Sequence, residues 1–176
     1  HYGATKLASE QLLLGYYREN GFPVTSLRFF SIYGPRERPD KLYTKLIDSI
    51  LNDWEFPLYE GSKEHLRSYT YIDDVVDGLI KVLENPDKAK GEIFNIGIDS
   101  SITTGKGIEI IENILGKKAK FDIQPKRPGD QKKTETNVTK ARQILGYNPT
   151  TPPEEGLKKQ VKWYKEKIWN KISLYQ

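Results

Sequence analysis

A tyrosine and a lysine near the start of the chain have the spacing of an acid/base pair. Tyr2 and Lys6 are four residues apart in a stretch with helical periodicity, and residues i and i+4 share one face of a helix. A nearby ammonium lowers the pKa of a phenol, which allows the phenol to take a proton from an alcohol and to return it. The same spacing arises by chance on many helices, so the pair alone leaves both interpretations open.

The composition describes a single soluble domain and excludes several classes of function. The chain has 176 residues, of which 30% are charged and 36% hydrophobic, and this length is sufficient for one domain with a core. Apolar runs stay well below the ~20 residues of a membrane span, so we expect no membrane partner. Cysteine is absent and only two histidines are present, which predicts no metal site and fits a cytoplasmic location.

The net charge of +4 raises the question of a nucleic-acid partner. Residues 158–167 contain five lysines around a single glutamate, Glu166, a pattern typical of a solvated helix face. Basic residues are not interleaved with aromatic ones as they are in RNA-binding sheets. We therefore expect the chain not to bind nucleic acid.

Hydrophobic periodicity and turn residues predict an α/β fold in which helices alternate with short strands. Residues 31–40, rich in Gly and Pro, are predicted to be an irregular loop at a strand end, where open α/β sheets bind ligands. Asp73 and Thr151 are predicted helix caps; Asp73 and Asp74 also resemble a catalytic carboxylate pair, but a helix start favours capping. The predicted helices are residues 3–20, 41–53, 73–84, 103–116, 137–146 and those after Thr151, and the predicted strands or extended segments are residues 24–30, 56–59, 67–72, 92–96 and 120–123.

Six short motifs occur in order along nearly the whole chain. Each is weak by itself, but the ordered set resembles the C-terminal half of an extended short-chain dehydrogenase/reductase of the NAD-dependent epimerase/dehydratase family. The motifs are Tyr2–Lys6, Leu27–Pro35, Arg67–Val75, Phe94–Gly97, Arg127–Asp130 and Leu145–Pro149.

The resemblance implies a single truncated unit made of two parts. Residues 1–34 and about 73–97 would be the last helix and strands of a Rossmann-type parallel sheet with its helices. Residues from about 35–72 and 98–176 would form a small α/β substrate-binding lobe.

The family's Gly-rich turn, which holds the pyrophosphate of NAD, has no counterpart in the sequence. The only Gly-x-Gly, Gly105-Lys106-Gly107, lacks a third glycine and does not directly follow a strand. The main NAD-binding segment and the family's catalytic Ser/Thr are therefore expected upstream of Tyr2, and the chain alone is expected to be inactive.

The resemblance also implies roles for residues of the cofactor and sugar sites. Tyr2 would take the proton from the sugar 4-hydroxyl while NAD accepts a hydride from C4. Lys6 would hold the nicotinamide ribose and lower the pKa of Tyr2. Phe29 would line the nicotinamide pocket, although its strand pattern favours a core position, and Ser31 would help to place the sugar, with a strand-end cap as the alternative.

Among the members of this family, UDP-glucuronate 4-epimerases are the most similar in the segment Gly34–Asp40 and in the C-terminal motifs, although Ser31 stands where they usually carry Thr. Arg38 would grip the carboxylate of the uronic acid through two parallel hydrogen bonds. Fixing that carboxylate would disfavour loss of CO2 once C4 is oxidised. The alternative for Arg38 is a solvated arginine in a Pro-rich loop.

The remaining substrate residues implied by the resemblance would bind the nucleotide. Arg67 and Arg127 would neutralise the diphosphate of a UDP-sugar, and Asp130 would orient Arg127 or accept from the uridine ribose. If the resemblance is set aside, each of these three residues is more simply interpreted as an ordinary surface charge.

Related activities and another class of function stay open. UDP-glucose 4-epimerase, UDP-glucuronate decarboxylase and nucleotide-sugar 4,6-dehydratase are the alternatives within the family. The other class is a non-catalytic fragment that binds a UDP-sugar or associates with copies of itself. The helix of residues 3–20 is apolar on more than one face. The resemblance implies that subunits pair through this helix, as they do in the family, so we expect a homodimer through it.

Overall fold

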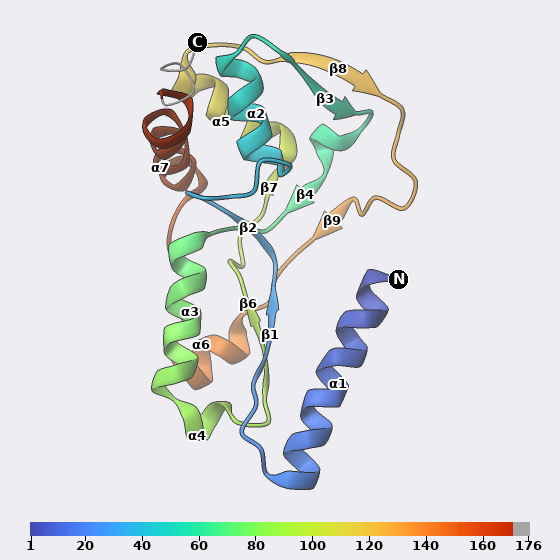
Figure 1. Ribbon diagram of the computed structural model, residues 1–176, viewed down its shortest axis with the longest axis vertical. Helices are drawn as coiled ribbons and strands as arrows, with labels where there is room; N and C mark the ends of the chain where they lie inside the picture. Colours follow the sequence, from blue (N-terminus) through green and yellow to red (C-terminus); the bar gives the residue numbers. More distant parts are fainter. Residues whose placement is uncertain (171–176) are drawn as a thin grey trace.

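The computed structural model describes residues 1–170 of the chain. Its elements form an α/β structure drawn out along one axis, with a group of helices and strands toward each end of that axis (Figure 1). Each group is built around a pair of parallel strands. The α/β fold class predicted from the sequence is therefore confirmed.

Helix α1 (Tyr2–Asn20) stands beside the rest of the chain (Figure 1). It ends as predicted at Gly21, whose left-handed backbone (φ 67°) lets its N–H donate to the oxygen of Tyr17. Within the helix, Glu10 and Leu14 are the buried residues. The large apolar side chains that it leaves exposed are Leu7, Leu12, Leu13 and Tyr16.

Strands β1 (Ser26–Phe29) and β6 (Ile93–Ile96) pair in parallel, and helices α3 (Ile72–Glu84) and α6 (Thr139–Leu145) pack against them. Gly78 lets α3 approach the sheet, because a Cβ there would lie only 2.8 Å from a side-chain carbon of β6. A short helix, α4 (Pro86–Ala89), leads from α3 to β6. The core of this group consists of Val75, Ala89, Phe94, Ile96, Val138, Ala141, Leu145 and Tyr147.

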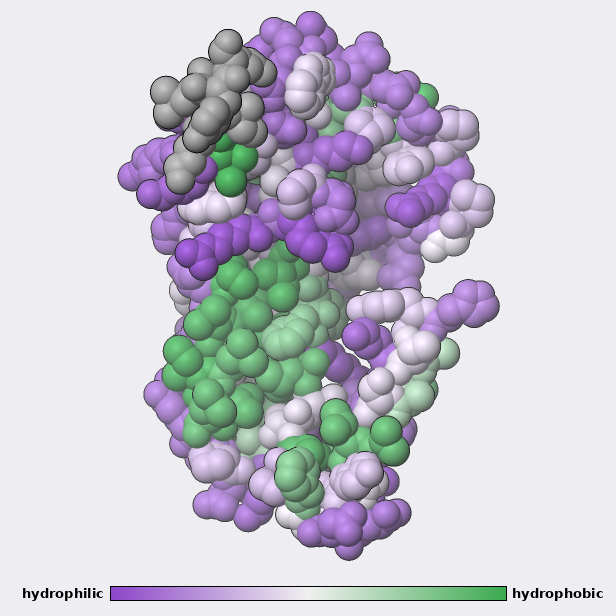
Figure 2. Space-filling view, viewed as in Figure 1, coloured by the Kyte–Doolittle hydropathy of each residue, from purple (hydrophilic) through white to green (hydrophobic). Residues whose placement is uncertain are grey.

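The outer side of α3 is apolar. Figure 2 shows hydrophobic residues gathered on this face of the molecule where Figure 1 draws that helix. The exposed apolar side chains of α3 are Val76, Leu79, Ile80 and Leu83.

Strands β2 and β5 connect the two groups. The sequence predicted an irregular loop from residue 31, but Ser31–Tyr33 forms strand β2 and pairs in parallel with β5 (Tyr69–Tyr71). The prediction was wrong for these three residues because their partner strand lies far away in the sequence, so local turn signals cannot reveal the pairing. Irregular backbone begins only at Gly34, as the Gly-Pro sequence predicts.

The second group is built on parallel strands β3 (Glu55–Tyr59) and β8 (Lys120–Gln124). Helices α2 (Leu42–Leu51), α5 (Thr104–Leu115) and α7 (Pro153–Tyr164) enclose its core. A 3-10 turn (Ser62–Glu64) follows β3, and a π-helical turn (Lys165–Trp169) extends α7. The buried apolar residues of this core are Tyr33, Tyr43, Leu46, Ile47, Ile50, Phe56, Leu58, Tyr71, Ile108, Ile110, Ile111, Leu157, Val161 and Tyr164.

A small three-stranded sheet lies between the two groups. Its central strand β4 (Leu66–Arg67) pairs antiparallel with β7 (Ile102–Thr103) and in parallel with β9 (Lys133–Thr134). This sheet brings the chain around residue 130 next to Arg67, although the two are distant in the sequence.

The two N-caps predicted from the sequence, Asp73 and Thr151, were both wrong by one or two residues. Thr103 caps α5 and accepts from the N–H of Lys106 at 3.1 Å. Tyr71 is the N-cap of α3, so Asp73 lies inside its first turn, where a carboxylate still faces the positive end of the helix. Pro152, and not Thr151, is the N-cap of α7. The N–H of Thr151 instead donates to Asp74 at 3.2 Å, which ties α7 to α3.

The division of the chain into a Rossmann part and a substrate lobe stays a prediction. Helix α6, from the range assigned to the lobe, packs with β6 and α3, and residues 171–176 of that range lie outside the described residues. Within residues 1–170, the helices are too short or too polar to cross a membrane. The same residues form no cluster of three or more side chains suited to hold a metal ion.

Candidate active site and nucleotide pocket

The predicted acid/base pair lies on one exposed face of α1. The Nζ atom of Lys6 is 5.4 Å from the centre of the Tyr2 ring, as the i, i+4 spacing requires, and Tyr2 is 76% exposed. Both residues line a cavity of about 520 Å3 between α1 and β1, together with Phe29. Phe29 is exposed and not in the core. The structure therefore brings together the three residues predicted for catalysis and cofactor binding.

An ion pair at the base of this cavity fixes α1 on β1. Arg28 of β1 donates two hydrogen bonds to the carboxylate of Glu10, at 2.8 and 2.7 Å. These hydrogen bonds hold the pKa of Glu10 below its usual value despite burial. Sequence reasoning missed this pair, although Glu10 continues the stripe of Tyr2 and Lys6 at the same four-residue interval.

A second cavity, of about 350 Å3, gathers the two arginines predicted to bind the nucleotide diphosphate and the aspartate predicted to assist them. Arg67, Arg127 and Asp130 all line it. The Arg127 guanidinium lies 5.4 Å from the centre of the Tyr59 ring, in cation–π geometry. Lys45 of α2 adds another cation to the lining. The cavity is therefore polar, basic and bordered by an aromatic ring.

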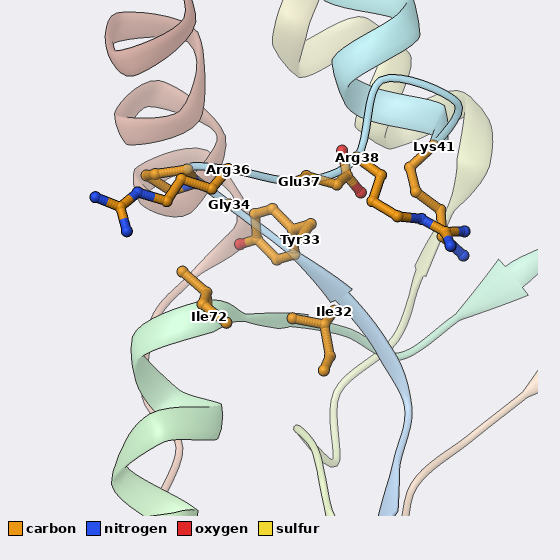
Figure 3. Close-up of a pocket in the computed structure, with 9 residues that line it drawn as sticks. Ile32, Tyr33, Gly34, Arg36, Glu37, Arg38, Lys41 and Ile72 are labelled. Carbon is orange, nitrogen blue, oxygen red and sulfur yellow. The ribbon is translucent and has the colours of Figure 1, made fainter. Parts of the chain in front are cut away.

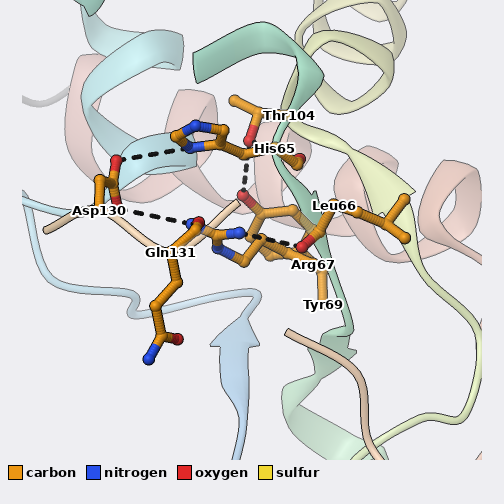
Figure 4. A network of polar contacts seen from close by, with 7 residues as sticks. All are labelled: His65, Leu66, Arg67, Tyr69, Thr104, Asp130 and Gln131. Atoms are coloured by element: carbon orange, nitrogen blue, oxygen red, sulfur yellow. Dashed lines mark hydrogen bonds and ion pairs between the residues drawn. The ribbon is translucent and has the colours of Figure 1, made fainter. Parts of the chain in front are cut away.

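Asp130 and Arg67 belong to a network of polar contacts that includes a residue missed in the sequence (Figure 4). Arg67 donates to the backbone oxygens of Leu66 and Gln131 and lies 3.5 Å from Asp130. The other oxygen of Asp130 lies 3.4 Å from Nδ1 of His65. The resemblance implied that Asp130 would orient Arg127 or accept from the uridine ribose. The structure pairs its carboxylate with Arg67 and His65, because the pairing of β9 with β4 brings the residues just before β9 beside these two side chains. Its contact with the ribose stays a prediction.

The loop after β2 forms a third cavity, also of about 350 Å3, bordered by Gly34–Arg38 and Lys41 (Figure 3). Arg38 is 69% exposed and pairs with Asp40 at 3.2 Å. Glu37 turns inward, and burial raises its pKa, although hydrogen bonds from Gln160 and Thr44 oppose that shift. Gly34 is required at the start of the loop, because its φ is 135° and a Cβ would lie 2.7 Å from Ile72.

Ser31, the remaining predicted site residue, is half-buried at the first position of β2 opposite Tyr69. It is not among the residues that line the three cavities described above. Its predicted contact with the sugar stays a prediction.

The glycines at 105 and 107 have a packing role. They lie in the first turns of α5, and a Cβ on Gly107 would lie 2.7 Å from the ring of Tyr43, which is buried. A Cβ on Gly105 would lie 3.2 Å from the backbone oxygen of Lys63. Close approach of α5 to its neighbours therefore explains both residues.

The tyrosine–lysine pair beside a parallel strand pair and the separate basic cavity place the chain in the class of α/β proteins with parallel strands, and comparison with known proteins identifies the family. The sequence profile of the NAD-dependent epimerase/dehydratase family matches residues 1–97. The chain belongs to this family, which confirms the resemblance seen in its motifs.

Individual relatives include epimerases for two sugars. The chain is 37% identical to UDP-glucuronate 4-epimerase 6 of Arabidopsis thaliana, over 93% of this chain and 38% of the relative. It superimposes with a TM-score of 0.88 and 34% identity on UDP-glucuronic acid 4-epimerase from Bacillus cereus, solved with UDP-glucuronic acid and NAD, over 94% of this chain and 52% of that one. The UDP-glucose 4-epimerase of Thermotoga maritima, solved with UDP-glucose, gives 0.87 and 31% over 95% and 54%. The chain thus spans about half the length of the relatives it matches or less.

Proposed function

We propose that the full-length gene product containing this chain is an NAD-dependent nucleotide-sugar 4-epimerase that interconverts UDP-glucuronate and UDP-galacturonate. The observation that carries the proposal is the grouping of site residues. Tyr2, Lys6 and Phe29 share one cavity, and Arg67 and Arg127 share another. The family and the ligands of the relatives support the same activity.

The nucleotide would bind in the cavity of Arg67 and Arg127. Two guanidinium groups and Lys45 match the charge of a diphosphate, and guanidinium forks suit phosphate oxygens. The guanidinium of Arg67 is held by Asp130 and by the backbone oxygens of Leu66 and Gln131. Arg67 is therefore preorganised for an anion before one arrives.

The chemistry at C4 would involve Tyr2 and Lys6. When bound, NAD supplies an acceptor that takes hydride from C4 and returns it to the opposite face of the sugar. The cation and the phenol of this cavity fit that cofactor, since Lys6 can donate to the nicotinamide ribose. Tyr2 takes the proton of the 4-hydroxyl as the hydride leaves and gives it back when the hydride returns, so that C4 is inverted.

Arg38 would select the uronic acid. Oxidation at C4 places the sugar carboxylate β to a ketone, from which CO2 is readily lost. A guanidinium that grips both carboxylate oxygens fixes the group in one orientation and stabilises its negative charge, which disfavours the loss of CO2. This contact would separate an epimerase from a decarboxylase.

The test is the product formed from UDP-glucuronate and NAD by the full-length gene product. We expect UDP-galacturonate in equilibrium with the substrate. UDP-xylose would instead identify a decarboxylase, and turnover of UDP-glucose alone would identify a UDP-glucose 4-epimerase. Failure to convert either sugar would overturn the proposed function.

A homodimer through α1 is proposed on a separate observation. Leu7, Leu12, Leu13 and Tyr16 are exposed on a helix whose buried contacts are few, and exposed apolar patches of this kind mark association surfaces. Sedimentation should show a dimer that Leu12→Glu converts to monomers, while Glu19→Gln on the same helix should leave it intact. A monomer without any substitution would contradict the proposal.

A further inference from the structure

The loop that carries Arg38 contains a strained turn. The N–H of Glu37 donates to the backbone oxygen of Gly34 at 3.1 Å, which closes a turn with Pro35 and Arg36 at its centre. Arg36 has a φ of 69°, and this left-handed conformation costs a residue other than glycine about 1–2 kcal/mol. Such a conformation persists only where surrounding contacts hold it in place.

Glu37 supplies those contacts. Its Oε2 atom accepts from the N–H and the hydroxyl of Thr44, both at 2.9 Å, and from Nε2 of Gln160 at 2.8 Å. Gln160 also donates to the Thr44 hydroxyl at 3.1 Å. The carboxylate thus joins the loop to the first turn of α2 and to α7, and hydrogen bonds to a charged group are about twice as strong as neutral ones.

The anchored residue lies between two arginines that point in different directions. Figure 3 shows Arg36 and Arg38 on opposite sides of the loop, with Arg38 and Lys41 on the same side. The side chain of Arg38 itself is held only by an exposed ion pair with Asp40, and exposed pairs contribute about 0–1 kcal/mol. The direction of the Arg38 side chain therefore depends on the backbone of the loop, which is anchored at the preceding residue, Glu37.

We propose that Glu37 is a positioning residue that aims Arg38 at the sugar carboxylate and thereby sets the preference for a uronic acid over a neutral hexose. The proposal rests on the proposed function and adds to it a residue that touches no substrate. A glutamate that only stabilised the loop would change the stability of the protein without changing the choice of sugar.

The test is a double-mutant cycle on sugar preference. Calorimetry measures the Kd of UDP-glucuronate and of UDP-glucose for the full-length gene product with NAD. The preference is reported by the Kd of UDP-glucose divided by the Kd of UDP-glucuronate. We expect Glu37→Ala and Arg38→Ala each to reduce this ratio about tenfold, the contribution of one charged contact. The double variant should lose no more than Arg38→Ala alone. Glu109→Ala, which removes an exposed carboxylate elsewhere, is the matched control and should leave the ratio unchanged.

Hydrogen exchange of the Thr44 amide in the same samples separates the two ways in which the proposal can fail. We expect Glu37→Ala to speed this exchange and Glu37→Gln, which keeps the shape of the side chain, to preserve part of the protection and part of the preference. Faster exchange with an unchanged ratio, or additive effects in the cycle, would overturn the positioning role. Equal binding of both sugars by the unsubstituted protein would overturn the proposed substrate and the contact of Arg38 with its carboxylate. The exchange rate of the Thr44 amide would still show whether Glu37 holds the loop.

Discussion

Glu10 of helix α1 and Arg28 of strand β1 are joined by two hydrogen bonds, at 2.7 and 2.8 Å. The carboxylate is buried, whereas the guanidinium is half exposed. Glu10 is four residues beyond Lys6, so the pair attaches the helix to the sheet close to the proposed acid/base residues. The position of Tyr2 and Lys6 over the cavity depends on this attachment.

Loss of the attachment should weaken the fold. Glu10→Gln removes the charge on a buried acceptor but leaves its shape, and we expect the free energy of unfolding to fall by about 1–2 kcal/mol. This is less than the cost of breaking a fully buried pair, because Arg28 is half exposed. Urea denaturation measures the change, with the exposed Glu19→Gln on the same helix as control. Equal stability of the two variants would show that the pair does not hold α1.

The pH dependence of stability should reveal Glu37. Burial raises its pKa above the usual value of 4.5, so the folded state binds the proton more tightly than the unfolded state. The contribution of Glu37 to stability is therefore greatest below about pH 4.5 and declines as pH rises through the raised pKa. Urea denaturation from pH 4 to 7 should show the advantage of the unsubstituted protein over Glu37→Gln shrinking with rising pH. A constant or growing advantage would contradict this sign.

Nucleotide binding in the cavity of Arg67 and Arg127, as proposed above, should depend on the shape of an arginine as well as on its charge. Arg67→Lys keeps the charge but loses the planar fork held by Leu66, Gln131 and Asp130. We expect the Kd for UDP to rise about tenfold, since a lysine offers only a point charge. Arg142→Lys, in an exposed pair with Asp99, is the control. An unchanged Kd for Arg67→Lys would place the diphosphate elsewhere.

Two glycines should respond in opposite directions to the same substitution. At Gly107 a Cβ would lie 2.7 Å from the buried ring of Tyr43, and overpacking of about 1–3 kcal/mol outweighs the helix propensity gained from alanine, about 1 kcal/mol. At Gly15 nothing lies within 4 Å, so only the gain remains. Thermal unfolding should give a lower Tm for Gly107→Ala and a higher one for Gly15→Ala. A stabilising Gly107→Ala would contradict the packing role.

The sequence predicted the elements whose signals are local. Helix α1 ends at Gly21 and α5 at Gly116, both in the left-handed conformation that a C-terminal glycine favours. The pairing of Tyr2 with Lys6 also follows from local geometry, since the helical repeat alone places them together.

Features that depend on distant partners were not predictable in the same way. Strand β2 exists because β5 lies beside it, and Asp130 meets His65 because β9 joins β4. Glu37 looked like one more charge in a loop, and only its hydrogen bond to Gln160, which is 123 residues away, shows that it points inward. The missed residues are thus those whose environment is created by tertiary structure.

The central claim is that Tyr2 transfers the proton at the sugar C4 in the full-length gene product. The most direct measurement compares conversion of UDP-glucuronate by the unsubstituted protein and by Tyr2→Phe, with calorimetry to verify that both still bind the substrate. We expect the substitution to reduce turnover by about 100-fold or more, because general acid/base groups contribute about 10²–10⁴-fold, and to leave the Kd within about twofold. Undiminished turnover by Tyr2→Phe would contradict the account.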